Sequence, residues 1–379
     1  SKAMQVPAAA GIFATGVEGL NGQIIVLDGQ AGTVLIDSDP QTLERYRALA
    51  LEDGRKAEQH LQIAAQPAFS KDNHLFLINA NISSLDEAQT AFGRYGADGI
   101  GLFRTEYLFL GRKKPPSEEE QYQYCLSILE LAGGKPVTAR TVDLGGDKTV
   151  DYLATADEAN PFLGLRGTRL ALANAQLLRN QICALLRAGA IGHLKIMFPL
   201  ISTVPEAKQA RMLVEECKSE LRRRNLPFNP DIQTGVMIET PASAVIADFL
   251  LQEFDFCSIG TNDLVQYTLA ADRTNPVVAG YADALDPAMI RLIAAVIRTA
   301  HQAGKPVSLC GELAADPIAV TLLAGLGLDE FSLNAPGIPL IKDRTRAVSL
   351  TEACQIAAHA LTLPSAVEVR AYLLSEGMR

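Results

Sequence analysis

The sequence predicts an α/β protein whose main part is a closed (β/α)8 (TIM) barrel, preceded by a small β-rich segment and a linker helix. Eight short apolar runs alternate with helical segments from about residue 74 onward, a pattern typical of parallel strands buried on both faces. Polar and charged residues gather where these runs end, which is where active sites form in such barrels. An open, doubly wound sheet also places ligands at the carboxyl ends of its strands, and it is the alternative fold.

Composition narrows the functional classes. The chain has 379 residues, 48% of them hydrophobic and 20% charged, enough for one large core and a smaller piece. Its formal net charge of -9 argues against a nucleic-acid-binding or anionic-membrane surface. No apolar run approaches the roughly 20 residues of a membrane span, and no signal pattern precedes the first strand. The six cysteines and five histidines show no metal-ligand spacing, and a chain of this size needs no disulfides to fold. Together these features lead us to expect a reduced, cytosolic protein without membrane insertion.

The first 40 residues differ from the rest. Residues 24–28 and 33–37 are β-branched runs separated by a glycine-containing turn, which predicts a hairpin. Asp39 followed by Pro40 is typical of an N-cap and the first helical position, and predicts a helix to about residue 65. One side of this helix is apolar, formed by Leu43, Tyr46, Ala50 and Leu51. We therefore expect a linker helix that lies on another part of the molecule.

The barrel strands are predicted from the apolar runs. They are expected at residues 75–79, 99–103, 136–139, 194–199, 234–238, 256–259, 306–309 and 330–333. Several of them are followed directly by residues with binding or catalytic chemistry, at 104–106, 140–143, 239, 260–263 and 310–312. These residues would meet at one rim of the barrel.

Arginines form the first candidate group at that rim. Arg104, Arg140, Arg166 and Arg273 each follow an apolar run in a polar or turn-rich context. Guanidinium groups bind phosphate and carboxylate in bidentate geometry, so four of them in a net-acidic chain indicate a site for a small anion. Any one of them alone would be an ordinary surface residue or structural ion pair.

A glycine pair lies in the segment Leu144-Gly-Gly-Asp-Lys-Thr149. The spacing of a Walker A motif is missing, which argues against nucleotide binding by that route. The glycines could let the backbone approach a ligand, with Lys148 as a point charge. The alternative is a tight turn between a strand and a helix.

Two carboxylates and a thiol complete the candidate site. Glu239 and Asp263 are 24 positions apart, about one strand-helix-strand interval, and two carboxylates completed by water and substrate phosphate are typical of Mg²⁺. Glu239 could instead cap a helix that begins at Pro241. Cys310 is either a buried core thiol or a group that exchanges a proton near neutral pH.

Seven motifs together closely resemble the phosphoenolpyruvate-binding half of enzyme I of the bacterial phosphotransferase system. They are residues 99–106, 140–148, 160–166, 196–199, 237–241, 259–264 and 310–313, within a similarity that extends from about residue 75 to residue 345. Pyruvate phosphate dikinase and phosphoenolpyruvate synthase have similar Gly-Thr-Asn-Asp and Cys-Gly-Glu signatures and are the alternative family members. Residues 266–273 and 327–332 look more like enzyme I.

The resemblance implies a role for each candidate residue. Phosphoenolpyruvate would be bound by Arg104, Arg140, Asn262, Asp263, Arg273, Lys148 and Arg166. Mg²⁺ would be bound by Glu239 and Asp263. Cys310 would be the proton donor that converts the enolate to pyruvate.

The resemblance also implies a domain organisation. Residues 1–38 would be a remnant of the phosphohistidine swivelling domain, residues 39–71 its linker helix, and residues 72–379 the phosphoenolpyruvate-binding and dimerisation barrel. The family's Gly-rich Thr-Ser-His motif, whose histidine accepts the phosphate and passes it to the histidine phosphocarrier protein, does not occur in this sequence. The resemblance also implies a homodimer, and we expect this chain to be a piece of a longer protein.

Two other functions are alternatives. Without its histidine, the chain could serve as a binding and dimerisation module only. It could also be a metal-dependent lyase barrel acting on oxaloacetate-like acids, although the Cys310-Gly-Glu312 motif and the arginines argue against that activity.

Overall fold

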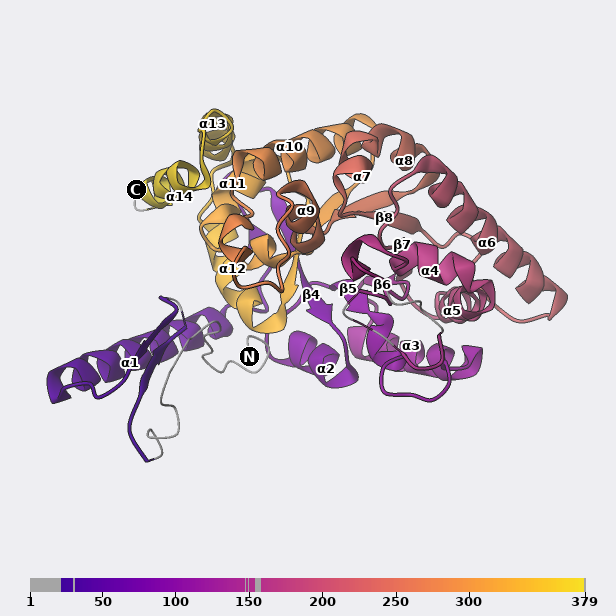
Figure 1. The fold of residues 1–379 in the computed structure, drawn as a ribbon, viewed down its shortest axis with the longest axis horizontal. Helices are drawn as coiled ribbons and strands as arrows, with labels where there is room; N and C mark the ends of the chain where they lie inside the picture. The colour runs from indigo at the N-terminus through magenta and orange to yellow at the C-terminus, as the bar shows by residue number, and fades with distance from the viewer. Residues whose placement is uncertain (1–21, 30, 147, 149, 154–157, 378–379) are drawn as a thin grey trace.

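The computed structural model describes residues 22–29, 31–146, 148, 150–153 and 158–377. Its centre is a closed barrel of parallel strands in sequential order, in which β11 pairs with β4 (Figure 1). The barrel strands are β4 (Leu75–Ile82), β5 (Ile100–Arg104), β6 (Val137–Arg140), β7 (Leu194–Phe198), β8 (Thr234–Ile238), β9 (Phe256–Ile259), β10 (Val307–Leu309) and β11 (Glu330–Asn334). The predicted strands are confirmed, and closure excludes the open sheet.

Helices surround the strands, as Figure 1 shows. They are α2 (Leu85–Gly93), α3 (Glu118–Ala132), α4 (Gly167–Ala173), α5 (Ala175–Ala188), α6 (Val204–Arg223), α7 (Pro241–Val245), α8 (Ala247–Glu253), α9 (Thr261–Thr268), α10 (Pro287–Gln302), α11 (Ala319–Gly325), α12 (Ile338–Arg346), α13 (Leu350–Ala360) and α14 (Ala366–Gly377). Capping boxes begin α3 at Ser117 and α6 at Thr203. No helix in the described part of the chain is both long and apolar enough to span a membrane.

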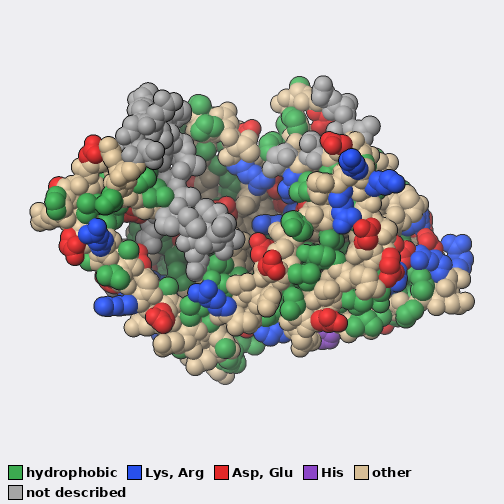
Figure 2. Space-filling model, turned by 90° about the horizontal axis from the view of Figure 1, so that it is seen from below, with side chains coloured by type: hydrophobic (Ala, Val, Ile, Leu, Met, Phe, Trp, Pro, Cys, Tyr) green, Lys and Arg blue, Asp and Glu red, His purple; other side chains and the backbone are tan. Residues whose placement is uncertain are grey.

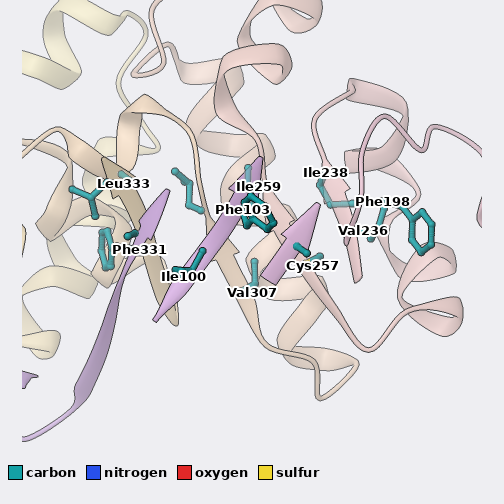
Figure 3. Close-up of a cluster of buried hydrophobic side chains, with 14 of the residues drawn as sticks. Ile100, Phe103, Phe198, Val236, Ile238, Cys257, Ile259, Val307, Phe331 and Leu333 are labelled. Atoms are coloured by element: carbon teal, nitrogen blue, oxygen red, sulfur yellow. The ribbon is translucent and has the colours of Figure 1, made fainter. Parts of the chain in front are cut away.

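The buried apolar side chains of the barrel form two clusters. The larger one lies between strands and helices and includes Phe103, Val236 and Cys257 (Figure 3). The smaller one contains Leu102, Met197, Met237, Phe256 and Cys310. Because successive side chains of a strand point to opposite faces, the smaller cluster is the filling of the barrel interior.

The amino-terminal elements lie to one side of the barrel (Figure 1). The predicted hairpin is confirmed as β1 (Val26–Asp28) paired antiparallel with β2 (Thr33–Leu35). The predicted helix is α1 (Pro40–Gln62), and the Asp39 side chain accepts a hydrogen bond from the Thr42 N–H at 2.9 Å. A short strand that was not predicted, β3 (Ala68–Phe69), pairs antiparallel with β4.

The carboxyl-terminal end of helix α1 contacts the barrel. His60 lies 3.5 Å from Asp343, and Arg346 Nη2 donates to the carbonyls of Ile63 and Gln66 just after the helix. None of the residues of α1 is fully buried; on its predicted apolar side Leu43 and Tyr46 are half-buried, whereas Ala50 and Leu51 are exposed. The assignment of residues 1–38 to a phosphohistidine domain falls mostly on residues outside the described part and stays a prediction.

The surface carries mixed charge. On the face drawn in Figure 2, Lys and Arg side chains alternate with Asp and Glu, and no broad basic field is present.

A buried lysine ties α12 to the barrel. Lys342 is 0% exposed, and its Nζ donates to Asp98 Oδ1 and to the Gly96 carbonyl, both at 2.7 Å. The substitution Lys342→Met is expected to lower the free energy of unfolding by about 3 kcal/mol, because it leaves the Asp98 carboxylate without its cation. Urea unfolding would measure this, and Asp98→Asn in the same chain should recover part of the loss. A loss below about 1 kcal/mol would contradict the prediction.

Candidate phosphoenolpyruvate-binding site

A cavity of about 430 Å³ opens at the carboxyl end of the barrel strands. Eight of the nine residues predicted for the site line it: Arg104, Arg140, Lys148, Glu239, Asn262, Asp263, Arg273 and Cys310. Strand register explains why they meet. Arg104 of β5 is paired with Arg140 of β6, while Glu239 and Cys310 directly follow strands that both pair with β9.

Arg140 is held by carboxylates at the floor of the cavity. Its Nη2 donates to Glu106 Oε1 at 2.6 Å and lies 3.5 Å from Asp143 Oδ2. Burial opposes its charge, but Glu106, Asp143 and Glu239 together hold the pKa of Arg140 above its ordinary value. Its Nε is buried without a hydrogen-bond acceptor among the described residues. Arg140 is therefore a fixed cation with donor capacity to spare.

Arg104 and Lys148 add two cations to the cavity, and nearby carboxylates act on them only at longer range. Within the described residues, neither side chain has an acceptor within hydrogen-bond or ion-pair distance. Burial, and then the charge of Arg140, lower the pKa of Arg104. Two like charges that make no hydrogen bond or ion pair with the described residues favour the binding of an anion.

Arg166 lies behind the cavity rather than in its lining. Its guanidinium contacts Asp143 at 3.2 Å, Asp263 at 3.5 Å and the Tyr267 hydroxyl at 3.1 Å. Arg273, in the segment after α9, lies 3.6 Å from Asp263 and is partly exposed. Asp263 thus links the buried arginine to the more exposed one.

The carboxylates of Glu239 and Asp263 lie close enough to influence each other. Burial, followed by the charge of Asp263, raises the pKa of Glu239 to about 8. Glu239 Oε1 accepts a hydrogen bond from the Leu200 N–H at 2.7 Å. The possibility that Glu239 caps α7 is excluded, because Thr240 is the N-cap and accepts from the Ser243 N–H.

This pair of carboxylates suits a hard divalent cation. Mg²⁺ prefers oxygen ligands and commonly takes one or two carboxylates, with water and substrate phosphate as the remaining ligands. The described residues contain no group of three or more His, Cys, Asp or Glu that could hold a metal without such help. Repulsion between two buried carboxylates is the feature that a cation would relieve.

Asn262 and Cys310 complete the lining. Asn262 Oδ1 accepts from the Glu312 N–H at 2.9 Å, which leaves its amide N–H groups for a ligand. Burial raises the pKa of the Cys310 thiol to about 11, so the thiol is protonated at neutral pH. The Cys310 carbonyl accepts from Asn81 Nδ2 at 3.0 Å, which fixes the backbone at this position.

Two lining residues had no assigned role in the sequence analysis. Glu106 and Asp143 are both buried beside the arginines, and Glu106 Oε1 also accepts from the Asp143 N–H at 2.9 Å. The sequence placed them just after strand ends. A carboxylate next to an anion site has no sequence signature, because only the structure shows that its charge is directed at an arginine.

Comparisons with known proteins show which family this barrel resembles. Residues 57–350 match the family model described as "PEP-utilising enzyme, PEP-binding domain". A phosphoenolpyruvate-protein phosphotransferase from Priestia megaterium is 42% identical over 92% of this chain and 61% of its own length. Proteins of that name from Geobacillus stearothermophilus and Bacillus subtilis (strain 168) are 42% and 40% identical over 98% of this chain, and over 64% and 65% of their own lengths.

The chain spans less than two thirds of the length of these curated relatives. Among solved structures, a citrate lyase from Burkholderia xenovorans LB400 has a TM-score of 0.44 and 16% identity, over 80% of this chain and 91% of that one, too low to carry a conclusion. The family model covers most of the barrel and includes every residue that lines the cavity. The chain therefore belongs to the family of phosphoenolpyruvate-utilising enzymes and contains its phosphoenolpyruvate-binding domain.

Proposed function

We propose that the cavity binds phosphoenolpyruvate with Mg²⁺, as the substrate-binding part of a phosphoenolpyruvate-protein phosphotransferase. The observation that carries the proposal is the set of cationic side chains in one cavity, two of which make no ion pair or hydrogen bond with the described residues. The relatives that bear this name support the reaction class. In the whole enzyme, phosphate would pass to a histidine and pyruvate would be released.

The formal charge of the site supports this ligand. Four cationic side chains and four carboxylates line the cavity, and Arg166 behind them adds a fifth cation. With all groups ionised, positive charges exceed negative charges by one. A bound divalent cation would raise this excess enough to balance the phosphoenolpyruvate trianion.

The two ends of the substrate would contact different residues. Arg104, Arg140 and Lys148 would receive the phosphoryl group, while Asn262 and Arg273 would receive the carboxylate. Phosphoryl transfer passes through a loose transition state with its charge on equatorial oxygens, so positioned cations are the main catalytic need. Mg²⁺, held by Glu239 and Asp263, would neutralise charge on the substrate oxygens.

Cys310 would protonate the methylene carbon of the enolate. It shares the interior apolar cluster with Leu102 and Met237, which also line the cavity, so an apolar floor adjoins the thiol. A methylene group fits such a floor, and a thiol whose pKa is about 11 holds the proton to be donated. Pyruvate would be the product.

The test is reconstitution with the missing acceptor. The chain, phosphoenolpyruvate, Mg²⁺ and a separately produced histidine domain from a close relative should release pyruvate in proportion to the histidine domain added. Binding without pyruvate release would favour a binding and dimerisation module. Cleavage of an oxaloacetate-like acid would favour a lyase, and phosphoenolpyruvate formation that depends on added nucleotide would favour a dikinase or synthase.

We propose in addition that the protein forms a homodimer and that the histidine phosphocarrier protein binds through the amino-terminal part. Exposed apolar side chains support the dimer: Leu163 is 71% exposed, and Val245 and Phe249, near the junction of α7 and α8, are 73% and 53% exposed. Removing such side chains from water is a typical source of dimer stability.

The double substitution Val245→Lys and Phe249→Lys is expected to give a monomer, because two charges would be buried in the contact. Sedimentation velocity would measure the mass. Met212→Lys, on the exposed face of α6, is the matched control and should leave the dimer intact. A monomeric unaltered protein would show that the dimer proposal is wrong, and a dimeric double variant would show that the interface lies elsewhere.

A further inference from the structure

We propose that Glu106 is a positioning residue for phosphoenolpyruvate, which holds the Arg140 guanidinium in the orientation that receives the phosphoryl group. This inference rests on the proposed function. Glu106 lies in the short helix η3 (Thr105–Leu108) that follows β5, and it is buried where it lines the cavity. An acidic side chain at this place would repel a trianion unless it served the arginine beside it.

A single oxygen of Glu106 connects the arginine to the loop that follows β6. Glu106 Oε1 accepts from Arg140 Nη2 at 2.6 Å and from the Asp143 N–H at 2.9 Å. Charge-assisted hydrogen bonds of this length are strong, and burial strengthens them further. The direction of the Arg140 side chain therefore depends on Glu106.

The remaining donors of Arg140 show what this orientation achieves. Nη2 is shared between Glu106 and Asp143, whereas the only hydrogen-bond partner of Nη1 within the described residues is the Met237 sulfur at 3.8 Å. A thioether is a weak acceptor, so Nη1 keeps its capacity to bind a stronger one. Glu106 takes one amino group of the guanidinium and leaves the other for phosphate.

The backbone of Arg140 and Val142 is also held by contacts that do not involve Glu106. Thr105 Oγ1 donates to the Arg140 carbonyl at 2.8 Å. Gln181 Nε2 donates to Thr105 Oγ1 at 3.0 Å, and Gln181 Oε1 accepts from the Val142 N–H at 2.8 Å. Loss of the Glu106 carboxylate should therefore release the guanidinium and the Asp143 N–H, while the backbone at Arg140 and Val142 stays in place.

Glu106 could instead serve only to balance the charge of the site, and this role predicts a different effect of its removal on phosphoenolpyruvate affinity. If Glu106 only offset the positive charge of the site, removal of its carboxylate would strengthen the binding of a trianion, and a shorter carboxylate would change nothing. If Glu106 positions Arg140, both changes weaken binding. The sign of the effect therefore separates the two roles.

The test is calorimetric titration of three variants with phosphoenolpyruvate and, separately, with pyruvate, both in Mg²⁺. Glu106→Leu is expected to weaken phosphoenolpyruvate binding about tenfold to a hundredfold, because a charged hydrogen bond is lost. Glu106→Gln should restore most of the affinity, since its amide oxygen can accept the same two N–H bonds. Glu106→Asp should weaken phosphoenolpyruvate binding because its shorter side chain places the carboxylate farther from Arg140. This variant provides the test if Glu106→Leu does not fold.

Pyruvate provides the internal control. It lacks the phosphoryl group, so its affinity should be unchanged in all three variants, whereas a disturbed fold would weaken both ligands. Glu330→Leu, at the opposite end of the barrel where Glu330 Oε2 accepts from Asn79 Nδ2 at 3.1 Å, is the matched variant and should leave both affinities unchanged. Failure of the unaltered protein to bind phosphoenolpyruvate would overturn the proposed function itself. If the unaltered protein binds phosphoenolpyruvate normally, two outcomes would overturn only the role of Glu106. One is unchanged or tighter phosphoenolpyruvate binding in Glu106→Leu and Glu106→Asp. The other is an equal loss of affinity for phosphoenolpyruvate and pyruvate.

Discussion

Cys310→Ala is expected to lower pyruvate formation in the reconstituted reaction by about 100-fold or more, the usual contribution of a general acid. Phosphoenolpyruvate affinity should stay close to that of the unaltered protein. The reason is that the thiol belongs to the apolar cluster beside the cavity and makes no hydrogen bond or ion pair with the arginines among the described residues, and burial keeps it protonated, with a pKa of about 11. Rapid-quench measurement of pyruvate, together with a binding titration, would separate the two effects.

The control for this variant is Cys257→Ala. Cys257 is also a buried thiol whose pKa burial raises to about 12, but it faces the outer core of the barrel. Its removal should cost some stability and leave turnover unchanged. If Cys310→Ala turned over as fast as the unaltered protein, the assignment of Cys310 as proton donor would be wrong.

Glu239→Gln is expected to abolish the dependence of phosphoenolpyruvate binding on Mg²⁺. The amide can still accept from the Leu200 N–H, so the fold is retained, but it no longer supplies an anionic ligand. In the unaltered protein, phosphoenolpyruvate should raise the melting temperature more with Mg²⁺ than with a chelator, because a ligand of the native state stabilises it in proportion to its affinity. In the variant the two shifts should be equal.

Glu330→Gln tests whether this loss is specific to the site. Burial raises the pKa of Glu330 as it does that of Glu239, but Glu330 begins β11 at the other end of the barrel. Its substitution should leave the Mg²⁺ dependence intact. A Glu239→Gln protein that still distinguished Mg²⁺ from chelator would rule out Glu239 as a metal ligand.

The barrel was predictable because strands buried on both faces read as continuous apolar runs. β8 and β9 have the predicted bounds, and the other strands differ by a few residues at their ends. β3 was missed because two residues with only Ala68 buried give no periodic pattern. The predicted apolar side of α1 is only partly covered, at Leu43 and Tyr46, and which surface covers it is not encoded in the helix itself.

The candidate site was predictable to the extent that it follows from strand ends. Arg104, Arg140, Glu239 and Cys310 lie together because parallel strands present their carboxyl ends at one rim. Arg166 could not be placed in this way, since its position behind the cavity depends on how a long segment folds back after β6. The resemblance to enzyme I supplied roles, while the structure supplied the carboxylates that orient the arginines.

The central claim is that this cavity binds phosphoenolpyruvate through its strand-end arginines, and calorimetric titration of the chain with phosphoenolpyruvate in Mg²⁺ tests it most directly. We expect a saturable isotherm with one site per chain, lost in Arg104→Ala and in Arg140→Ala while each variant keeps its cooperative unfolding. An absence of saturable binding, or binding that both alanine variants retain, would contradict the claim.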